Sequence, residues 1–334
     1  MRSLLRFYSL ASRPVCALKA MAYARRWKRP LRAPLPVVSV GNLSLGGAGK
    51  TPVVMRLVAW AEGRGLEPAV VTRGYKGLWE RSGGVLSDGK DLRGGWREAG
   101  DEPAMIARRF PRAGVFVGRH RFLSCQKARQ AGFDFVLLDD GFQHVRLARD
   151  LDIVLHHPGL KAALREGPGA LRRADVVLIE TDSGREVSLA FRGPRPGPAV
   201  FPFQIRPEAV VDLASGALSP PESLRGKRVL AVCGIARPER FFLLLDKLGL
   251  EVTGRMLFPD HFDFPPRVLA EIAAKGARLR PEAFVTTEKD AVKLEAAARS
   301  FRLPVLALRI GVVLPEAFFQ VVGAALAKAE NGHA

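Results

Sequence analysis

Cysteine and long apolar runs are both scarce in this chain. Only three of its 334 residues are cysteines, and Cys16, Cys125 and Cys233 lie far apart with no C-x-x-C pair. Such a sparse, odd count is typical of a protein in a reducing compartment and argues against a zinc site. No run reaches the ~18–20 apolar residues of a membrane-spanning helix, so the sequence predicts no transmembrane helix. Basic residues also interrupt every apolar run near the start, which argues against a signal peptide.

Acidic residues are missing from the first part of the chain, because no Asp or Glu precedes Glu62. Residues 1–32 instead carry many Lys and Arg, with large apolar side chains such as Leu4, Phe7 and Trp27 between them. This pattern suits a helix that lies on an anionic bilayer surface. The alternative is a helix packed on the protein with a solvated basic face. We expect residues 1–32 to associate with a membrane.

The net charge of +19 implies an anionic partner. Nucleic acid, an anionic membrane surface and phosphorylated substrates all qualify. The sequence contains no recognised nucleic-acid-binding module, and its basic residues concentrate in the amphipathic start, so we expect no nucleic-acid partner. No obligate protein partner is evident either.

Short apolar runs rich in β-branched residues alternate with stretches of helical periodicity along the chain. Each run is almost continuously apolar, as expected for parallel strands buried on both faces. The alternation predicts an α/β fold with a doubly wound sheet. Residues 183–226 are rich in Pro and Gly and read as an extended or hairpin-like connection. We therefore expect a larger domain over 33–182, a linker over 183–226 and a smaller α/β domain over 227–330.

A glycine-rich stretch, "GNLSLGGAGKTP" (residues 41–52), follows the apolar run "LPVVSV". It differs from the consensus phosphate loop, G-x-x-x-x-G-K-[ST], because Ser44 takes the place of the first glycine. Glycines let the backbone turn tightly and direct several N–H groups at a phosphate. The predicted nucleotide-binding residues are Gly46, Gly47, Ala48, Gly49, Lys50 and Thr51.

The residues that end this loop have separate predicted roles. Lys50 would reach the β- and γ-phosphates of a nucleotide, and the Thr51 hydroxyl would ligate Mg²⁺. The helix expected to begin at Thr51 and Pro52 adds the positive end of its dipole. The alternative is a glycine-rich turn with no ligand. The stretch by itself predicts a phosphate site and does not specify the reaction.

Two consecutive carboxylates, Asp139 and Asp140, end the apolar run of "FDFVLLDDGFQH". The carboxyl end of a parallel strand is where α/β sheets bind ligands, so this pair is predicted to position Mg²⁺ beside the phosphate loop. The alternative is a solvated turn, because Asp-Gly pairs commonly form turns.

Asp101 and Glu102 of "GDEP" lie at a predicted helix start. Asp101 can cap the first amides of such a helix, which is a structural role. It can equally accept the proton of an attacking hydroxyl, or the pair can supply a further metal ligand. The sequence of this stretch alone leaves both roles open.

Two further stretches contain candidate residues. "FPDHFDF" places His261 near the end of a predicted strand, where it could orient an Asp across a crevice. "TTEKDAVKL" (residues 286–294) places a dense set of charges where a strand passes into a helix. Its Thr residues suit an ordinary helix cap, and its charges are either solvated or line a crevice.

Taken in order, "SVGNLSLGGAGKTP", "TRGYKG", "GDEP", "DDGFQH", "LREGPGALRRAD" and "TTEKDAVKL" resemble the tetraacyldisaccharide 4′-kinase family of lipid A biosynthesis. The resemblance implies transfer of the γ-phosphoryl group of ATP–Mg²⁺ to the 4′-hydroxyl of an acylated glucosamine disaccharide 1-phosphate. It implies a phosphate-loop NTPase-type domain and a smaller α/β domain joined by an extended two-stranded linker. It also implies a peripheral location at the cytoplasmic face of the inner membrane.

The resemblance further implies roles for individual residues. Asp101 corresponds to the catalytic base, His261 to its partner, and Lys50 to a catalytic phosphate contact. The implied metal set is Thr51, Glu102, Asp139 and Asp140. The implied substrate-binding set is Tyr75, Arg121, Gln143, His144 and Arg165.

The chain departs from the family pattern at two places. It reads "LREGP" where the family usually reads "LREP", which puts the roles of Arg165 and Glu166 in question. The family often doubles the histidine after "PD", whereas Phe262 follows His261 here. A rival interpretation is a phosphate-loop NTPase that acts as a conformational switch with a protein partner. A nucleic-acid-binding ATPase is a further rival, suggested by the basic composition.

Overall fold

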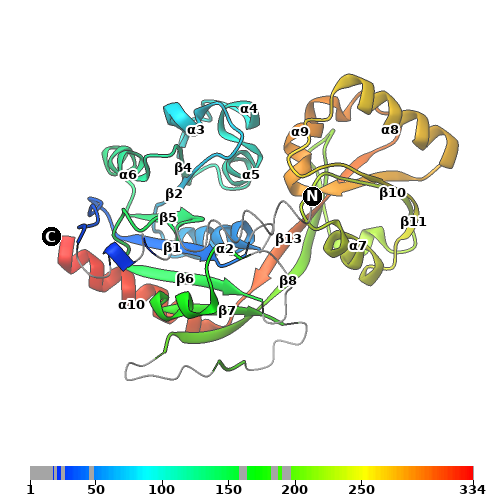
Figure 1. Ribbon diagram of the computed structural model, residues 1–334. Helices are drawn as coiled ribbons and strands as arrows, with labels where there is room; N and C mark the ends of the chain where they lie inside the picture. The colour runs from blue at the N-terminus through cyan, green and yellow to red at the C-terminus, as the bar shows by residue number, and fades with distance from the viewer. Residues whose placement is uncertain are drawn as a thin grey trace. The chain divides into compact units, whose positions relative to one another are not determined.

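The computed structural model describes residues 18, 21–23, 27–44, 49–157, 164–181, 187–189 and 197–333 (Figure 1). The chain divides into two compact units. The larger unit comprises 1–99, 106–205 and 312–334, and the smaller unit comprises 100–105 and 206–311. These units are discontinuous in sequence, whereas the domains expected above are contiguous; the expected division stays a prediction.

The larger unit is built on a sheet with the strand order β8-β7-β6-β1-β5-β2-β4-β3. Neighbouring strands are parallel, except that β3 runs antiparallel to β4. Every residue of β1 is buried, which explains its continuous apolar character. The strands are β1 (Val37–Asn42), β2 (Pro68–Thr72), β3 (Gly84–Asp88), β4 (Gly114–Val117), β5 (Phe135–Asp139), β6 (Leu151–His156), β7 (Val176–Glu180) and β8 (Ala199–Asp212).

Helices cover the sheet of the larger unit. Helix α2 contacts β1, β2 and β5, and α6 contacts β2 and β4. In helix α10, Phe319 stacks on Trp60 of α2 with ring centroids 5.9 Å apart. The helices described in this unit are α2 (Lys50–Glu62), α3 (Trp79–Ser82), α4 (Trp96–Ala99), the later part of α5 (Asp101–Arg109), α6 (Arg121–Gln130), the 3₁₀ helix η1 (Pro168–Arg173) and α10 (Glu316–His333).

The smaller unit contains the parallel strands β11-β10-β12-β13 in that order. Helix α7 lies on one face of this sheet, and α8 and α9 lie on the other (Figure 1). Phe241 and Leu245 of α7 belong to one hydrophobic cluster, and Ile272 of α8 and Leu294 of α9 belong to a second cluster. This is the doubly wound arrangement predicted from the alternating pattern. The elements are β9 (Leu218–Ser219), η2 (Pro221–Leu224), β10 (Arg228–Cys233), α7 (Pro238–Lys247), β11 (Glu251–Leu257), α8 (Pro266–Leu279), β12 (Ala283–Thr287), α9 (Glu288–Ala298) and β13 (Val305–Val313).

The described part of residues 183–226 contains regular β-structure and is not simply an irregular connection. β8 pairs parallel with β7, and its later residues pair antiparallel with β9. Both β8 and β13 run from one unit into the other, so two strands connect the units. Among the described residues, no helix combines the length and apolar character needed to cross a membrane. Most of the basic stretch 1–32 lies outside the described residues.

Candidate active site

The predicted phosphate loop leads from β1 into α2, as expected. Gly46, Gly47 and Ala48 lie outside the described residues, but Gly49 caps α2 in the left-handed region with φ 82°. Only glycine adopts that conformation without strain, and a Cβ added there would lie 3.1 Å from Ile205 Cδ1. Lys50 and Thr51 then begin the helix, and Thr51 is buried.

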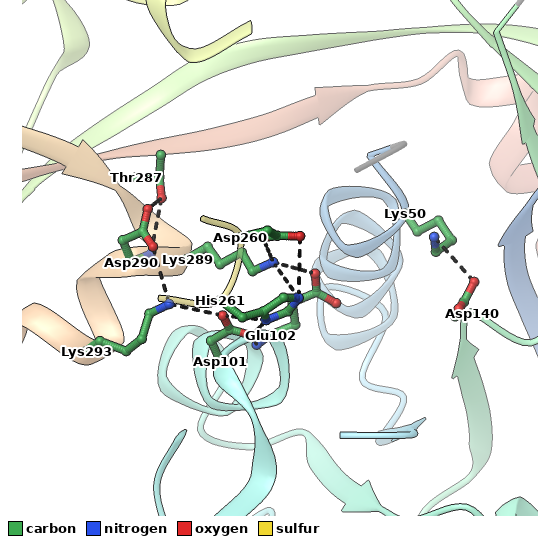
Figure 2. Close-up of polar contacts among 10 residues, drawn as sticks. All are labelled: Lys50, Asp101, Glu102, Asp140, Asp260, His261, Thr287, Lys289, Asp290 and Lys293. Atoms are coloured by element: carbon green, nitrogen blue, oxygen red, sulfur yellow. Dashed lines mark hydrogen bonds and ion pairs between the residues drawn. The ribbon is translucent and has the colours of Figure 1, made fainter. Parts of the chain in front are cut away.

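Lys50 lies between an amide and a carboxylate. Its ammonium donates to Asn42 Oδ1 at 3.0 Å, and its Nζ is 3.3 Å from Asp140 Oδ1 (Figure 2). Asn42 is fully buried and is itself fixed, because its amide donates to the backbone oxygen of Ser44 at 2.8 Å. Ser44, which departs from the phosphate-loop consensus, therefore helps to orient the residue that holds Lys50.

The carboxylates at the end of β5 differ in environment. Asp139 is the last residue of the strand and is buried. Asp140 follows with φ 56°, a left-handed conformation that Asp tolerates better than most residues. Arg165 donates to Asp140 Oδ2 at 2.7 Å. Enclosure by the protein would raise the pKa of Asp140, but the charges of Lys50 and Arg165 outweigh this effect and hold the pKa well below its usual range.

Gln143 connects this cluster to the altered "LREGP" stretch. Its amide donates to the backbone oxygen of Asn42 at 3.0 Å and to Glu166 Oε1 at 3.2 Å. Arg173 donates to Glu166 Oε2 at 2.6 Å. The extra glycine at 167 thus leaves Arg165 and Glu166 with charged or polar partners in the same cluster. Sequence reasoning missed Asn42 and Arg173, although both lie in motifs that it quoted.

Arg121 is the predicted substrate-binding residue with the least solvent exposure, at 4%. Burial lowers the pKa of its guanidinium to about 10, although the charges of Asp140 and Asp139 counteract this effect. Tyr75 is 54% exposed, and the backbone oxygen of His144 accepts a hydrogen bond from Arg149 at 3.4 Å.

A second polar cluster lies in the smaller unit and is centred on Asp101, the first residue of α5. Nδ1 of His261 is 2.9 Å from both carboxylate oxygens of Asp101 (Figure 2). Lys293 donates to Oδ2 at 3.2 Å, and the backbone N–H of Glu102 donates to Oδ1 at 3.0 Å. Asp101 is 4% exposed. Burial would raise the pKa of Asp101, but the hydrogen bond from His261 and the charges of Lys289, His261 and Lys293 hold the pKa well below its ordinary value.

His261 adopts a left-handed conformation with φ 61°, which is uncommon for a residue with a side chain. Because the carboxylate of Asp101 only accepts, the ring nitrogen that contacts it, Nδ1, carries a proton; the other ring nitrogen is Nε2. The ammonium of Lys289 is 3.3 Å from that Nε2. Lys289 also contacts Asp260 at 3.0 Å and Glu102 at 3.3 Å. Burial would lower the pKa of Lys289, but Glu102, Asp101 and Asp260 together raise it above its ordinary value.

The "TTEKDAVKL" stretch both caps a helix and supplies buried charges. Thr287 is the N-cap of α9, and its hydroxyl accepts from the backbone N–H of Asp290 at 3.1 Å. The expectation of an ordinary Thr cap is therefore confirmed. The alternative that the charges are simply solvated is wrong for Asp290 and Lys293, which are both buried. They are ion-paired with each other at 3.3 Å.

Comparisons with known proteins agree with the sequence motifs. The model of the family described as tetraacyldisaccharide-1-P 4′-kinase matches residues 1–327. A tetraacyldisaccharide 4′-kinase from Pelobacter propionicus is 37% identical over 94% of this chain and 89% of its own length. The enzyme of the same name from Anaeromyxobacter sp. (strain Fw109-5) is 42% identical over 90% of this chain and 85% of its own length.

A solved structure is also similar. The crystal structure of LpxK from Aquifex aeolicus in complex with ATP has a TM-score of 0.77 and 28% sequence identity, covering 97% of this chain and 99% of that chain. The similarity confirms the predicted phosphate-loop kinase fold with its second α/β unit. Since the family model spans nearly the whole sequence, this chain belongs to the tetraacyldisaccharide-1-P 4′-kinase family.

Proposed function

We propose that this chain transfers the γ-phosphoryl group of ATP to the 4′-hydroxyl of a tetraacylated glucosamine disaccharide 1-phosphate. The main support is the Asp101–His261 pair, a buried and ionised carboxylate oriented by an imidazole, in a member of this kinase family. An acceptor alcohol needs a group that takes its proton. A switch NTPase needs no such acceptor, and the family membership does not favour that alternative.

The residues around Lys50 fit ATP with Mg²⁺. Mg²⁺ prefers oxygen ligands, and it is usually held by one or two carboxylates together with substrate phosphates. Asp139, Asp140 and the Thr51 hydroxyl supply such oxygens where β5 ends and α2 begins. Within the described residues, no group of three or more His, Cys, Asp or Glu is placed to hold a metal ion. Glu102 stays a predicted metal-side residue. When bound, Mg²⁺ would neutralise phosphate charge.

The side chains of the larger unit would bind and align the phosphates. Lys50 would contact the β- and γ-phosphates, with Asn42 directing its ammonium. Arg121 and Arg165 would add positive charge near Asp140. Phosphoryl transfer depends mostly on alignment and on neutralising charge in the transition state, so these contacts are the principal catalytic contribution of this unit.

The Asp101 carboxylate would take the proton of the 4′-hydroxyl. As the new bond forms between the hydroxyl oxygen and the γ-phosphorus, the bond from that phosphorus to the bridging oxygen breaks and ADP leaves. The low pKa of Asp101 keeps it ionised and able to accept a hydrogen bond from the alcohol. A weak base suffices, because the transition state is loose and the nucleophile needs little activation before attack. Tyr75, Gln143 and His144 stay predicted substrate contacts.

Incubation of the full chain with Mg-ATP and the disaccharide 1-phosphate lipid in detergent tests this activity. We expect label from γ-labelled ATP to appear in a bis-phosphorylated lipid and ADP to accumulate in equal amount. Release of inorganic phosphate without labelled lipid, by demonstrably folded protein, would support the switch NTPase instead. Omission of the lipid provides the background rate of ATP hydrolysis.

We also propose that the protein is peripheral to the inner membrane at its cytoplasmic face, where an acylated substrate resides. The basic, apolar stretch 1–32 supports this location. The full chain is expected to co-sediment with vesicles containing anionic lipid, and deletion of residues 1–29 is expected to weaken that binding. Binding should fall as salt rises, because exposed charges more than ~10 Å apart are screened at 0.1 M salt. Equal binding by both proteins would indicate that the stretch packs on the protein.

A further inference from the structure

Helix α9 directs two lysines at two consecutive carboxylates of the smaller unit. Lys289 and Lys293 are four residues apart and therefore lie on one side of the helix. Lys293 contacts Asp101 at 3.2 Å, and Lys289 contacts Glu102 at 3.3 Å (Figure 2). The two lysines differ in burial: the side chain of Lys293 is 1% exposed, whereas that of Lys289 is 16% exposed. Lysine side chains are almost never fully buried unless they are paired, so the burial of Lys293 needs an explanation.

We infer that Lys293 is a positioning residue that fixes the orientation of the Asp101 carboxylate for phosphoryl transfer. This inference rests on the proposed function of Asp101 as the base. In this role Lys293 would not contact the reacting atoms. Its effect on the reaction would pass through the carboxylate that it holds.

The hydrogen bonds around Asp101 leave its carboxylate few other orientations. An ionised carboxylate offers about four lone-pair sites. The Glu102 N–H donates to Oδ1, Lys293 donates to Oδ2, and His261 Nδ1 lies at equal distance from both oxygens. Among the described residues, the hydrogen-bonding contact that Oδ2 would retain without Lys293 is the one shared with His261. The carboxylate could then rotate about its bond to Cβ.

Lys293 is itself fixed by a partner at the start of its own helix. Asp290 accepts from the Thr287 hydroxyl at 2.8 Å and from the backbone N–H of Gly234 at 2.9 Å. Its other oxygen, Oδ1, is 3.3 Å from the Lys293 ammonium. The ring of Phe264 lies 5.7 Å from the same ammonium. A continuous chain of polar contacts therefore runs from the helix cap through Asp290 and Lys293 to Asp101.

The competing explanation is purely structural. Asp290 has no solvent exposure, and a buried carboxylate is costly without a partner. In that case Lys293 would serve only to neutralise Asp290, and its contact with Asp101 would have no effect on the reaction. The two explanations differ in what happens when Asp290 is made neutral at the same time as Lys293.

The decisive experiment compares Lys293→Met with the double variant Lys293→Met/Asp290→Asn. We expect Lys293→Met to lower both the melting temperature and kcat, with kcat falling by up to about 10²-fold, as a small misplacement of a catalytic group can cost. The KM for ATP should stay unchanged. The double variant removes the unpaired buried charge, so its melting temperature should recover while kcat stays low. Lys247→Met, at an exposed lysine that ends α7, is the matched control.

A second measurement does not depend on activity. The Nδ1 proton of His261 in its hydrogen bond to Asp101 should give a far-downfield proton resonance, assigned by its loss in His261→Gln. In the double variant we expect this resonance to move or broaden. Recovery of kcat together with the melting temperature, or an unshifted resonance, would overturn the inference. If wild-type protein forms no bis-phosphorylated lipid, the proposed function fails, and the resonance still decides whether Lys293 fixes Asp101.

Discussion

Replacement of Asp101 by asparagine is expected to lower kcat for lipid phosphorylation by about 10²- to 10⁴-fold, the range that a positioned general base contributes. Asparagine has nearly the same shape, and its oxygen can still accept hydrogen bonds from His261 or Lys293. It cannot take the proton of the 4′-hydroxyl. The affinity for ATP should change little, because the predicted nucleotide contacts are Lys50, Thr51 and the glycines of residues 46–49.

Steady-state kinetics of labelled lipid formation, combined with calorimetric titration of ATP, would measure both quantities. Asp263→Asn is a suitable control, since it removes one carboxylate from an exposed position near His261. Thermal unfolding should be recorded for both variants, because Asp101 is a partner of a buried lysine. If Asp101→Asn retains kcat within a few-fold of wild type, the base lies elsewhere.

Replacement of Lys50 by alanine is expected to reduce kcat by about 10²- to 10³-fold, the typical cost of removing one preorganised group that stabilises transition-state charge. The ammonium is held by Asn42 and Asp140, so it is already directed before a nucleotide binds. Its loss also removes one of the positive charges around Asp140, where the ion pair with Arg165 and the charge of Arg121 remain. The negative charge of the carboxylates near the phosphates would then be less compensated.

The same lipid assay, together with ATP titration, measures this effect. Lys127→Ala removes an exposed lysine from α6 of the same unit and should leave kcat unchanged. A loss of ATP affinity with full kcat at saturating ATP would show that Lys50 contributes binding alone. Retention of both would remove Lys50 from the phosphate site.

The fold could be predicted largely because its strands are local apolar runs. The apolar runs "LPVVSV", "FDFVLLDD" and "ADVVLIE" form β1, β5 and β7, in which every residue except Glu180 is buried. Strand β3 has no such run and could not be predicted in this way. It pairs at one edge of the sheet, and its sequence, GVLSD, lacks a continuous apolar run. Strand β8 lies in a segment whose Pro and Gly content predicts a connection, although its backbone pairs regularly with β7.

Individual candidate residues could be predicted from motifs, but their partners could not. Periodicity places Asp101 at a helix start and Asp140 after a strand, and both positions are confirmed. The contact between Lys293 and Asp101 joins residues 192 positions apart, and a local sequence pattern cannot predict such a contact. The left-handed backbone at Asp140 and His261 was also unpredictable. Asp and His adopt this conformation more often than most residues with a side chain, but the great majority of them do not, so residue type alone does not mark these positions.

The division of the chain constrains how the protein can be dissected. The smaller unit consists of two segments, residues 100–105 and 206–311. No single continuous fragment can therefore contain this unit without also containing part of the larger one. A fragment of 206–311 would keep Lys293 and His261 but lose Asp101, their shared partner. Among the described residues of such a fragment, Asp290 is the carboxylate that would still pair with buried Lys293. For split-protein or domain-exchange work, the short segment that contains Asp101 must therefore travel with the smaller unit, despite its distance along the chain.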